Sequence, residues 1–237
     1  MKNFIEKYDN ALSNDICDKL VELTSHKSVK SWQGVTGDGI QPEVKKTTDF
    51  NLHAVVSDDI KIAIRDALVK HLTLYMKENM IAHIPEALAV SDVELIQSWV
   101  LGTFIIDQRS LFVKKYSDET DHFNWHVDNQ ANTNAWLHQA RQLVMMFYLN
   151  DVEKGGTTDF MHQNVSLKPT KGSLVIFPAN WMHVHRGSPP LSGEKFILNY
   201  WLLQKNPITI KVFREIKDFL NLTEILKNTE EWTKKNM

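Results

Sequence analysis

Two side chains of metal-ligand type stand two positions apart near the middle of the chain. The segment HFNWHVDN contains His126 and Asp128, and residues two apart on a β-strand point to the same face. One imidazole and one carboxylate would therefore be directed at a single point. A second histidine from a distant strand would complete a triad that leaves three coordination positions open, the arrangement of non-haem Fe(II) sites. An H-x-D pair is common by chance, so this hypothesis depends on the rest of the chain.

The segment FPANWMHVHRGSPPLSGEKFILNYW supplies candidates for the third ligand. It places His183 and His185 on one short β-like stretch, and Lys195 follows ten positions after His185. Parity does not separate the two histidines. A lysine directed into an apolar barrel needs an anionic partner, because an unpaired buried charge costs several kcal/mol. A dicarboxylate that chelates the metal at one end would supply this anion at the other.

These residues resemble the prolyl 4-hydroxylase-like branch of the iron(II)/2-oxoglutarate dioxygenases. In that family an H-x-D is followed by a distal histidine and, about ten residues later, by a lysine or arginine. Four residues match this pattern in order and spacing: His126, Asp128, His185 and Lys195. The resemblance covers roughly residues 112–203, including RQLVMMFYLNDVEKGGTTDF and KPTKGSLVIF, and extends more loosely to DNALSNDICDKLVEL. The ten-residue step to the lysine favours His185 as the ligand, which leaves His183 as a hydrogen-bond partner near the site.

The chain also departs from its relatives. Phe123 stands three positions before His126, where relatives often have tyrosine, so one contact to substrate or solvent is in doubt. The segment 129–141 is longer than in some relatives and would lie beside the mouth of the site. We expect this segment to influence the choice of substrate.

The resemblance implies a set of site residues. Fe(II) would be bound by His126, Asp128 and His185. Co-substrate 2-oxoglutarate would be bound by Lys195, Tyr116, Tyr148 and Asn199. Substrate contacts are expected from Arg141, Trp201 and Trp125. Strand parity supports part of this set, because an inward Lys195 also directs Ile197, Asn199 and Trp201 inward. Alternatives stay open for the last group: Arg141 as a surface ion pair, and the two tryptophans as cover of the core.

The activity implied is hydroxylation of an unactivated C–H bond with O2 and 2-oxoglutarate as co-substrates, and with ascorbate as a possible accessory. Peptidyl proline is the nearest family precedent for the substrate, and a free amino acid or another small metabolite is the alternative. Two other readings are a cupin-like metal-binding protein that does not use 2-oxoglutarate, and a jelly-roll binding module without catalysis. A buried Lys195 facing the metal would favour the dioxygenase.

The elements that must position these residues fall into three zones of one domain, 1–237. Residues 1–100 are expected to form a helical flank, with helices starting near Ser13 and Ser57, and a glycine-rich loop between them. Residues 101–204 contain several short strands separated by Pro, Gly or Asn, which is typical of a jelly roll. Residues 205–237 are expected to be helical. The fold class is therefore α+β, with a double-stranded β-helix (jelly-roll) core between N-terminal helices and a C-terminal helix.

The composition of the chain argues against some classes of binding partner. The chain has 237 residues and a formal net charge of −2, so no basic excess indicates nucleic acid. No apolar run is long enough to span a bilayer, and the charged N-terminus does not resemble a signal peptide. The single cysteine, Cys17, permits no intrachain disulfide and is expected to be a buried apolar residue. A cytoplasmic protein without membrane or nucleic-acid partners is the resulting expectation.

Overall fold

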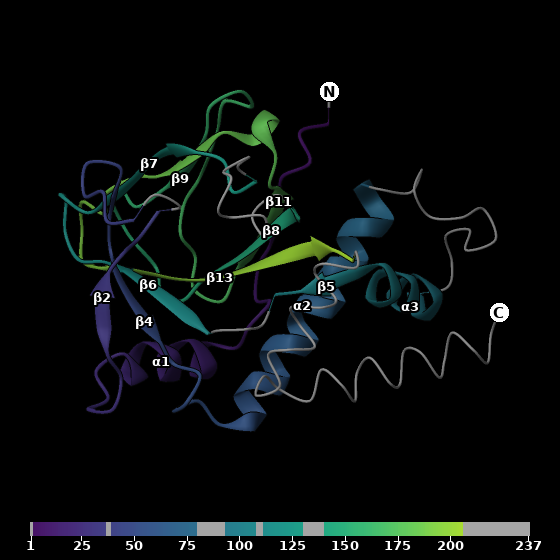
Figure 1. Ribbon diagram of the computed structural model, residues 1–237, viewed down its shortest axis with the longest axis horizontal. Coiled ribbons are helices and arrows are strands. Elements are labelled where there is room, and N and C mark those ends of the chain that lie inside the picture. Colours follow the sequence, from purple (N-terminus) through teal and green to yellow (C-terminus); the bar gives the residue numbers. More distant parts are fainter. Residues whose placement is uncertain (1, 37–38, 80–92, 108–110, 130–139, 206–237) are drawn as a thin grey trace.

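The computed structural model describes residues 2–36, 39–79, 93–107, 111–129 and 140–205 (Figure 1). These residues form two antiparallel sheets that face each other, with helices on the outer side of the larger sheet. The larger sheet has the order β1-β11-β8-β13-β6-β4-β2, and β5 pairs with β13. The smaller sheet has the order β10-β9-β12-β7-β3.

The larger sheet comprises β1 (Glu6–Tyr8), β2 (Ser31–Gln33), β4 (Thr48–Asn51), β5 (Phe104–Ile106), β6 (Phe112–Tyr116), β8 (Arg141–Tyr148), β11 (Leu174–Pro178) and β13 (Lys195–Gln204). The smaller sheet comprises β3 (Lys45–Lys46), β7 (His122–His126), β9 (Thr158–Phe160), β10 (Val165–Leu167) and β12 (His185–Gly187). The helices are α1 (Asn14–Leu23), α2 (Asp58–Asn79), α3 (Val93–Thr103) and the short 3-10 turn η3 (Trp181–His183).

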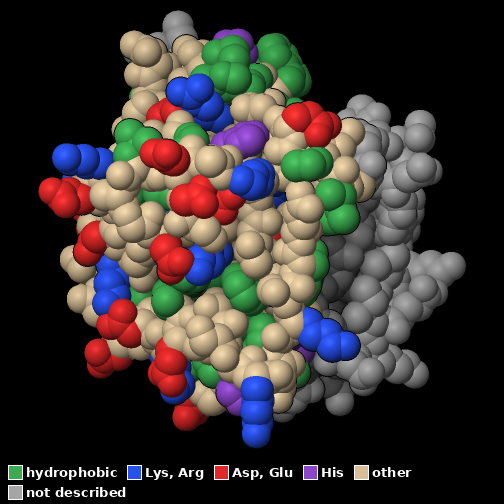
Figure 2. All heavy atoms as spheres, turned by 90° about the vertical axis from the view of Figure 1, so that its left-hand side faces the viewer, with side chains coloured by type: hydrophobic (Ala, Val, Ile, Leu, Met, Phe, Trp, Pro, Cys, Tyr) green, Lys and Arg blue, Asp and Glu red, His purple; other side chains and the backbone are tan. Residues whose placement is uncertain are grey.

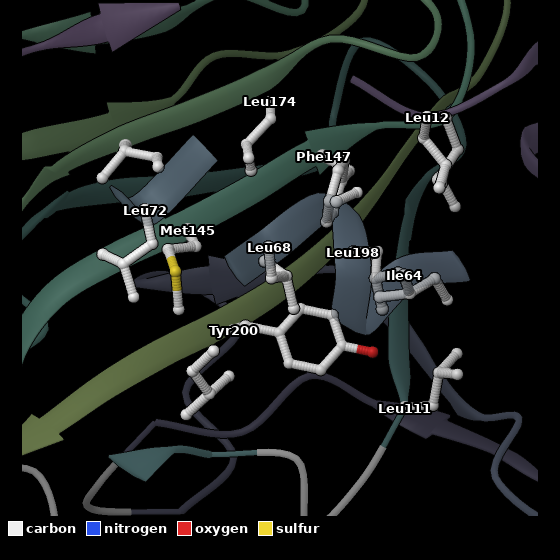
Figure 3. Packing of buried hydrophobic residues seen from close by; sticks show 14 of the residues in the cluster. Leu12, Ile64, Leu68, Leu72, Leu111, Met145, Phe147, Leu174, Leu198 and Tyr200 are labelled. Atoms are coloured by element: carbon white, nitrogen blue, oxygen red, sulfur yellow. The ribbon is translucent and has the colours of Figure 1, made fainter. Parts of the chain in front are cut away.

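The central strands of the larger sheet are buried on both faces: one face packs against the helices, and the other faces the smaller sheet. Met145 and Phe147 of β8 pack with Leu68 and Leu72 of α2 and with Leu198 of β13 (Figure 3). The alternate residues of both strands point to the smaller sheet. Because a strand covered on both sides carries apolar residues in succession, β8 reads as a continuous apolar run. The helical side therefore anchors the strands whose other side forms the site.

The two expected N-terminal helices are confirmed. Ser13 caps α1, since its hydroxyl accepts a hydrogen bond from the backbone N–H of Ile16. The α2 helix begins at Asp58, next to the expected start. Cys17 is fully buried in the core, as its apolar surroundings in the sequence predict.

The helical flank expected over residues 1–100 also supplies four short strands, β1, β2, β3 and β4, which were not predicted from the sequence. These strands have two to four residues, too few to show a periodic pattern. Their pairing is set by distant partners: β1 pairs with β11, β4 with β6, and β3 with β7. The segment expected to be a loop between the helices thus starts with a strand. The C-terminal helix expected over 205–237 lies, from residue 206 on, outside the described residues.

No helix in the described part of the chain is long and apolar enough to cross a membrane. Figure 2 shows the face formed over β2, β4, β6 and β7. Acidic and basic side chains are interspersed on this face, and no stripe of one sign runs across it.

Candidate active site

Strand pairing within the smaller sheet brings the three expected metal ligands together. His126 ends β7 and is the direct cross-strand partner of His185 on β12. Asp128 follows two residues after the end of β7. One ligand atom from each of the three residues lies within 4.8 Å of the others. An ion at about 2.1 Å from each atom would fit between them after a small inward adjustment.

Both imidazoles are held by backbone carbonyls through their Nδ1 atoms. His126 Nδ1 lies 2.7 Å from the carbonyl oxygen of Asn124, and His185 Nδ1 lies 3.0 Å from the carbonyl oxygen of His183. A carbonyl oxygen only accepts, so each Nδ1 carries the hydrogen and each Nε2 keeps a free lone pair. Burial, with the nearby His185, lowers the pKa of His126 to about 3. The imidazole of His126 is therefore in the neutral form that binds metals.

Asp128 is fixed by two side chains that we expected at the substrate. The indole N–H of Trp201 donates to Asp128 Oδ1 over 3.1 Å. Arg141 donates from Nη1 to the backbone oxygen of Asp128 and lies 3.7 Å from Oδ1. Burial opposes ionisation of Asp128, but the close approach of His185, whose Nε2 lies 3.3 Å from Oδ2, and the charge of Arg141 hold the pKa of Asp128 well below the usual range. The carboxylate is therefore charged and oriented.

The geometry favours His185 over His183 as the third candidate ligand. His183 lies in η3 and not on a strand, so the premise that both histidines share a strand face is wrong. Its Nε2 lies 2.9 Å from the backbone oxygen of Asn3, and its Nδ1 lies 3.4 Å from the side-chain oxygen of Asn180. Only His185 joins the cluster with His126 and Asp128.

The triad borders a pocket of about 460 Å³ between the two sheets. All nine expected site residues other than Tyr148 line it, and so do Thr158 and Ile197; the nine are Tyr116, Trp125, His126, Asp128, Arg141, His185, Lys195, Asn199 and Trp201. Lys195 is 1% exposed, and its Nζ lies 4.7 Å from the centre of the Tyr116 ring. This Nζ has no hydrogen-bond partner among the residues described. Burial, partly offset by Asp159, lowers the pKa of Lys195 to about 7.

Tyr148 does not line the pocket, although its ring centre lies 5.8 Å from Lys195 Nζ. Its hydroxyl donates to Thr158 Oγ1 over 2.7 Å. Thr158 itself lines the pocket, so the tyrosine positions the threonine. Asn199 does face the pocket, and its Oδ1 is buried without a hydrogen-bond partner in the described ranges.

Trp125 is 38% exposed at the pocket, and the Arg186 guanidinium covers its ring at 4.6 Å. Arg186 also donates from Nε to Asp159 over 2.8 Å. Trp125 is thus an exposed aromatic surface at the rim, and Arg186 holds it in place.

Sequence reasoning missed several pocket residues. Lys114 is 7% exposed and lines the pocket. Strand parity could have found it, because Lys114 stands two positions before Tyr116 on β6. Lys45 and Asp49 form a buried ion pair of 2.8 Å in the wall. No sequence signal pointed to this pair, since it lies in the short strands that were expected to be a flank.

Comparisons with known proteins agree with this geometry. Residues 111–203 match the family model described as the 2OG-Fe(II) oxygenase superfamily. The chain is 28% identical over 96 residues to prolyl 4-hydroxylase subunit alpha-3 of Rattus norvegicus, a match that covers 34% of this chain and 17% of that protein. It is 24% identical over 226 residues to the probable prolyl 4-hydroxylase 7 of Arabidopsis thaliana, covering 84% of this chain and 62% of that protein.

Solved structures show the same fold. The viral collagen prolyl hydroxylase of Paramecium Bursaria Chlorella virus-1 superposes with a TM-score of 0.56 at 19% identity, over 85% of this chain and 97% of that one. A prolyl hydroxylase from Trichoplax adhaerens, in complex with a peptide fragment of a hypoxia inducible factor, gives a TM-score of 0.57 at 15% identity, over 86% and 84% of the two chains. The expected jelly-roll core is therefore confirmed.

Proposed function

We propose that this chain, whose residues 111–203 match the model of the 2OG-Fe(II) oxygenase superfamily, is an Fe(II)- and 2-oxoglutarate-dependent dioxygenase that hydroxylates an unactivated C–H bond. One observation carries the proposal. Three neutral or anionic ligands converge on one point, and the unpaired ammonium of Lys195 is buried in the pocket beside them. The chain spans only 17% of the length of the first mammalian relatives, so their activity as whole proteins is not carried over.

The donor set fits the metal. Two imidazole nitrogens and one carboxylate oxygen on one side of an ion suit Fe(II) and leave positions for 2-oxoglutarate and O2. When bound, the iron and 2-oxoglutarate supply O2 activation coupled to release of succinate and CO2, with hydroxylation of the substrate. His126, Asp128 and His185 are the proposed ligands. Their Nδ1 contacts and the Trp201 hydrogen bond fix the orientation of each ligand before any metal binds.

Lys195 fits the far carboxylate of 2-oxoglutarate. A buried ammonium without a partner is unfavourable, and an ion pair with a carboxylate removes most of that cost. The Tyr116 ring lies against the same ammonium, and Thr158, whose hydroxyl accepts a hydrogen bond from Tyr148, lines the same pocket. Apolar neighbours such as Ile197 limit the entry of water, which strengthens this charge pairing.

For the substrate we propose a peptidyl proline, since the relatives named above are prolyl hydroxylases. A free amino acid or another small metabolite is the alternative. Trp125 at the rim is the proposed stacking surface for the residue to be hydroxylated. Arg141 and Trp201, which we expected to contact the substrate, are proposed mainly to orient Asp128 through their hydrogen bonds to it.

Three further points belong to the proposal. Ascorbate is expected to keep the iron reduced. A cytoplasmic location rests on the single cysteine, which permits no intrachain disulfide. Peptide or amino-acid partners are preferred over nucleic acid because the net charge is −2.

The test uses the purified protein under anaerobic conditions, titrated with Fe(II) and then with 2-oxoglutarate. We expect one Fe(II) per chain and a visible charge-transfer band when 2-oxoglutarate chelates the iron. Asp128→Ala should lose the iron, and Lys195→Met should keep the iron but require much more 2-oxoglutarate. Lys115→Met removes a lysine from the opposite face of the same pocket strand, where it pairs with Glu194, and should behave as wild type.

Aerobic release of succinate, screened with proline peptides and free amino acids, then identifies the substrate class. A protein that binds iron without the chelate band would be a cupin-like metal protein, and the proposal would be withdrawn.

A further inference from the structure

A second lysine is buried in the pocket without a partner. Lys114 Nζ has no hydrogen bond or ion pair among the described residues, and the side chain lines the same cavity as the triad. Burial and the neighbouring charge of Lys45 lower the pKa of Lys114 to about 8, partly offset by Asp49 and Asp128. A lysine in such a place destabilises the fold, so its presence calls for an anion that arrives from outside.

The nearest carboxylate in the wall is already engaged. Asp49 is the cross-strand partner of Lys114. However, Asp49 Oδ2 accepts from Lys45 over 2.8 Å, and Asp49 Oδ1 accepts from Thr47 over 2.8 Å. The charge of Asp49 is therefore shared with Lys45, and Asp128 is expected to serve the metal. Neither carboxylate neutralises Lys114.

The two unpartnered lysines are directed to different parts of the pocket. On β6 and β13, Lys195 pairs with Tyr116, and Lys114 pairs with Ile197. Lys195 Nζ lies over the Tyr116 ring, whereas Lys114 Nζ lies 5.4 Å from the centre of the Trp201 ring. In register Lys114 stands only two positions from Lys195, so what distinguishes the two side chains is the aromatic ring that each ammonium group approaches. One small carboxylate group is therefore a poor match for both ammonium groups.

Lys114 has a second cation beside it. The Arg141 guanidinium lies 3.9 Å from the centre of the same Trp201 ring, and its charge acts on Lys114. The indole of Trp201 also donates to Asp128. Lys114 and Arg141 thus lie around the ring of Trp201, whose indole is hydrogen-bonded to Asp128 of the triad.

Resting on the function proposed above, we propose that Lys114 binds a carboxylate of the substrate, next to the C–H bond that is hydroxylated. The substrate class is then a carboxylic acid, not merely an apolar ring. Two sources share this chemistry: the free carboxylate of a proline-like acid, or the side-chain carboxylate of an acidic residue beside proline in a peptide. The position of Lys114 near the triad makes it a determinant of specificity for either source.

The experiment compares acids with their neutral amides as substrates of the iron-loaded enzyme. One pair is N-acetyl-L-proline and N-acetyl-L-prolinamide, and the other is acetyl-Ala-Pro-Glu-amide and acetyl-Ala-Pro-Gln-amide. We expect at least a tenfold preference in kcat/KM for the acid of one pair, and that pair identifies the source. Lys114→Met should abolish the preference, Lys114→Arg should retain part of it, and Lys115→Met on the opposite face of β6 should retain all of it.

Binding without turnover provides the second readout. In protein labelled with 13C at lysine Cε, a bound carboxylate should raise the pKa of Lys114, and the matching amide should leave it unchanged. Failure of both acids to move this pKa overturns the proposal. So does a rise in the KM for 2-oxoglutarate in Lys114→Met as large as in Lys195→Met, since Lys114 would then serve the co-substrate.

The proposed function and the role of Lys114 are contradicted by different results. Wild-type protein that releases no succinate from 2-oxoglutarate under any condition contradicts the proposed function. Wild-type protein that releases succinate but does not distinguish acids from amides contradicts only the role of Lys114.

Discussion

Replacing Lys195 by methionine should make the protein without ligands more stable while it weakens binding of 2-oxoglutarate. Burial lowers the pKa of Lys195 from 10.5 to about 7. The unfolded chain therefore holds this proton more tightly than the folded protein between these two values. Because one pKa unit corresponds to about 1.4 kcal/mol, the folded state at pH 7 loses roughly 4 kcal/mol relative to one with a solvated lysine.

The sign of the pH dependence follows from the same values. A lysine whose pKa is lowered by folding destabilises the protein fully below the folded pKa, and the penalty disappears as pH rises toward 10.5. At pH 9 about 2 kcal/mol of it should remain. Methionine has a similar unbranched shape and carries no charge. The free energy of unfolding of Lys195→Met should thus exceed that of wild type by roughly 4 kcal/mol at pH 7 and roughly 2 kcal/mol at pH 9.

Urea denaturation of both proteins at the two pH values, without metal or 2-oxoglutarate, measures this difference. Lys114 is present in both proteins, so its own titration cancels in the comparison. Lys115→Met, on the opposite strand face, controls for the loss of one positive charge. A wild type more stable than Lys195→Met, or an equal difference at both pH values, would refute the account of Lys195 as an unpaired buried cation.

Three other substitutions test the site. His126→Ala should abolish succinate release and Fe(II) binding with the fold retained, which circular dichroism and an iron assay can check; full activity would remove this residue from the metal site. Gly187→Ala would put a methyl group 2.7 Å from the hydroxyl oxygen of Tyr116, so the tyrosine must move and the KM for 2-oxoglutarate should rise at least several-fold; an unchanged KM would show that Tyr116 does not shape the co-substrate pocket. Thr158→Val leaves the buried Tyr148 hydroxyl without its acceptor, and urea denaturation should show a loss of about 1–3 kcal/mol, whereas no loss would mean that the hydroxyl finds another partner.

The longer helices and strands and the positions of the candidate metal ligands could be predicted because the sequence around them has a clear local pattern. Strand β13 shows this: an inward Lys195 correctly placed Asn199 and Trp201 on the pocket side. The assignment of Asn199 and Tyr116 to 2-oxoglutarate stays a prediction. The hydrogen bond from the Tyr148 hydroxyl to Thr158 was not predicted, because strand parity gives the face on which a side chain lies but not its hydrogen-bond partner.

The remaining errors come from long-range pairing. The two-residue spacing of His183 and His185 does not distinguish a strand from a 3-10 turn. In the structure His183 belongs to η3, and Asn180 caps this turn. The strands β1 to β4 are too short to have a recognisable pattern in the sequence, and most of them pair with strands far along the chain. Lys114 was visible by parity but was overlooked because a lysine on a short strand usually faces solvent.

Residues of the N-terminal third of the chain form part of the pocket wall. The family match spans residues 111–203, yet Trp32, Gln41 and the Lys45–Asp49 pair from outside that span line the cavity. Part of the cavity wall thus comes from outside the stretch that supplies the candidate metal ligands. Substitutions at Trp32, Gln41 or the Lys45–Asp49 pair would alter the cavity wall without replacing any candidate metal ligand, so two proteins with the same ligand motif can differ in the shape of their pockets.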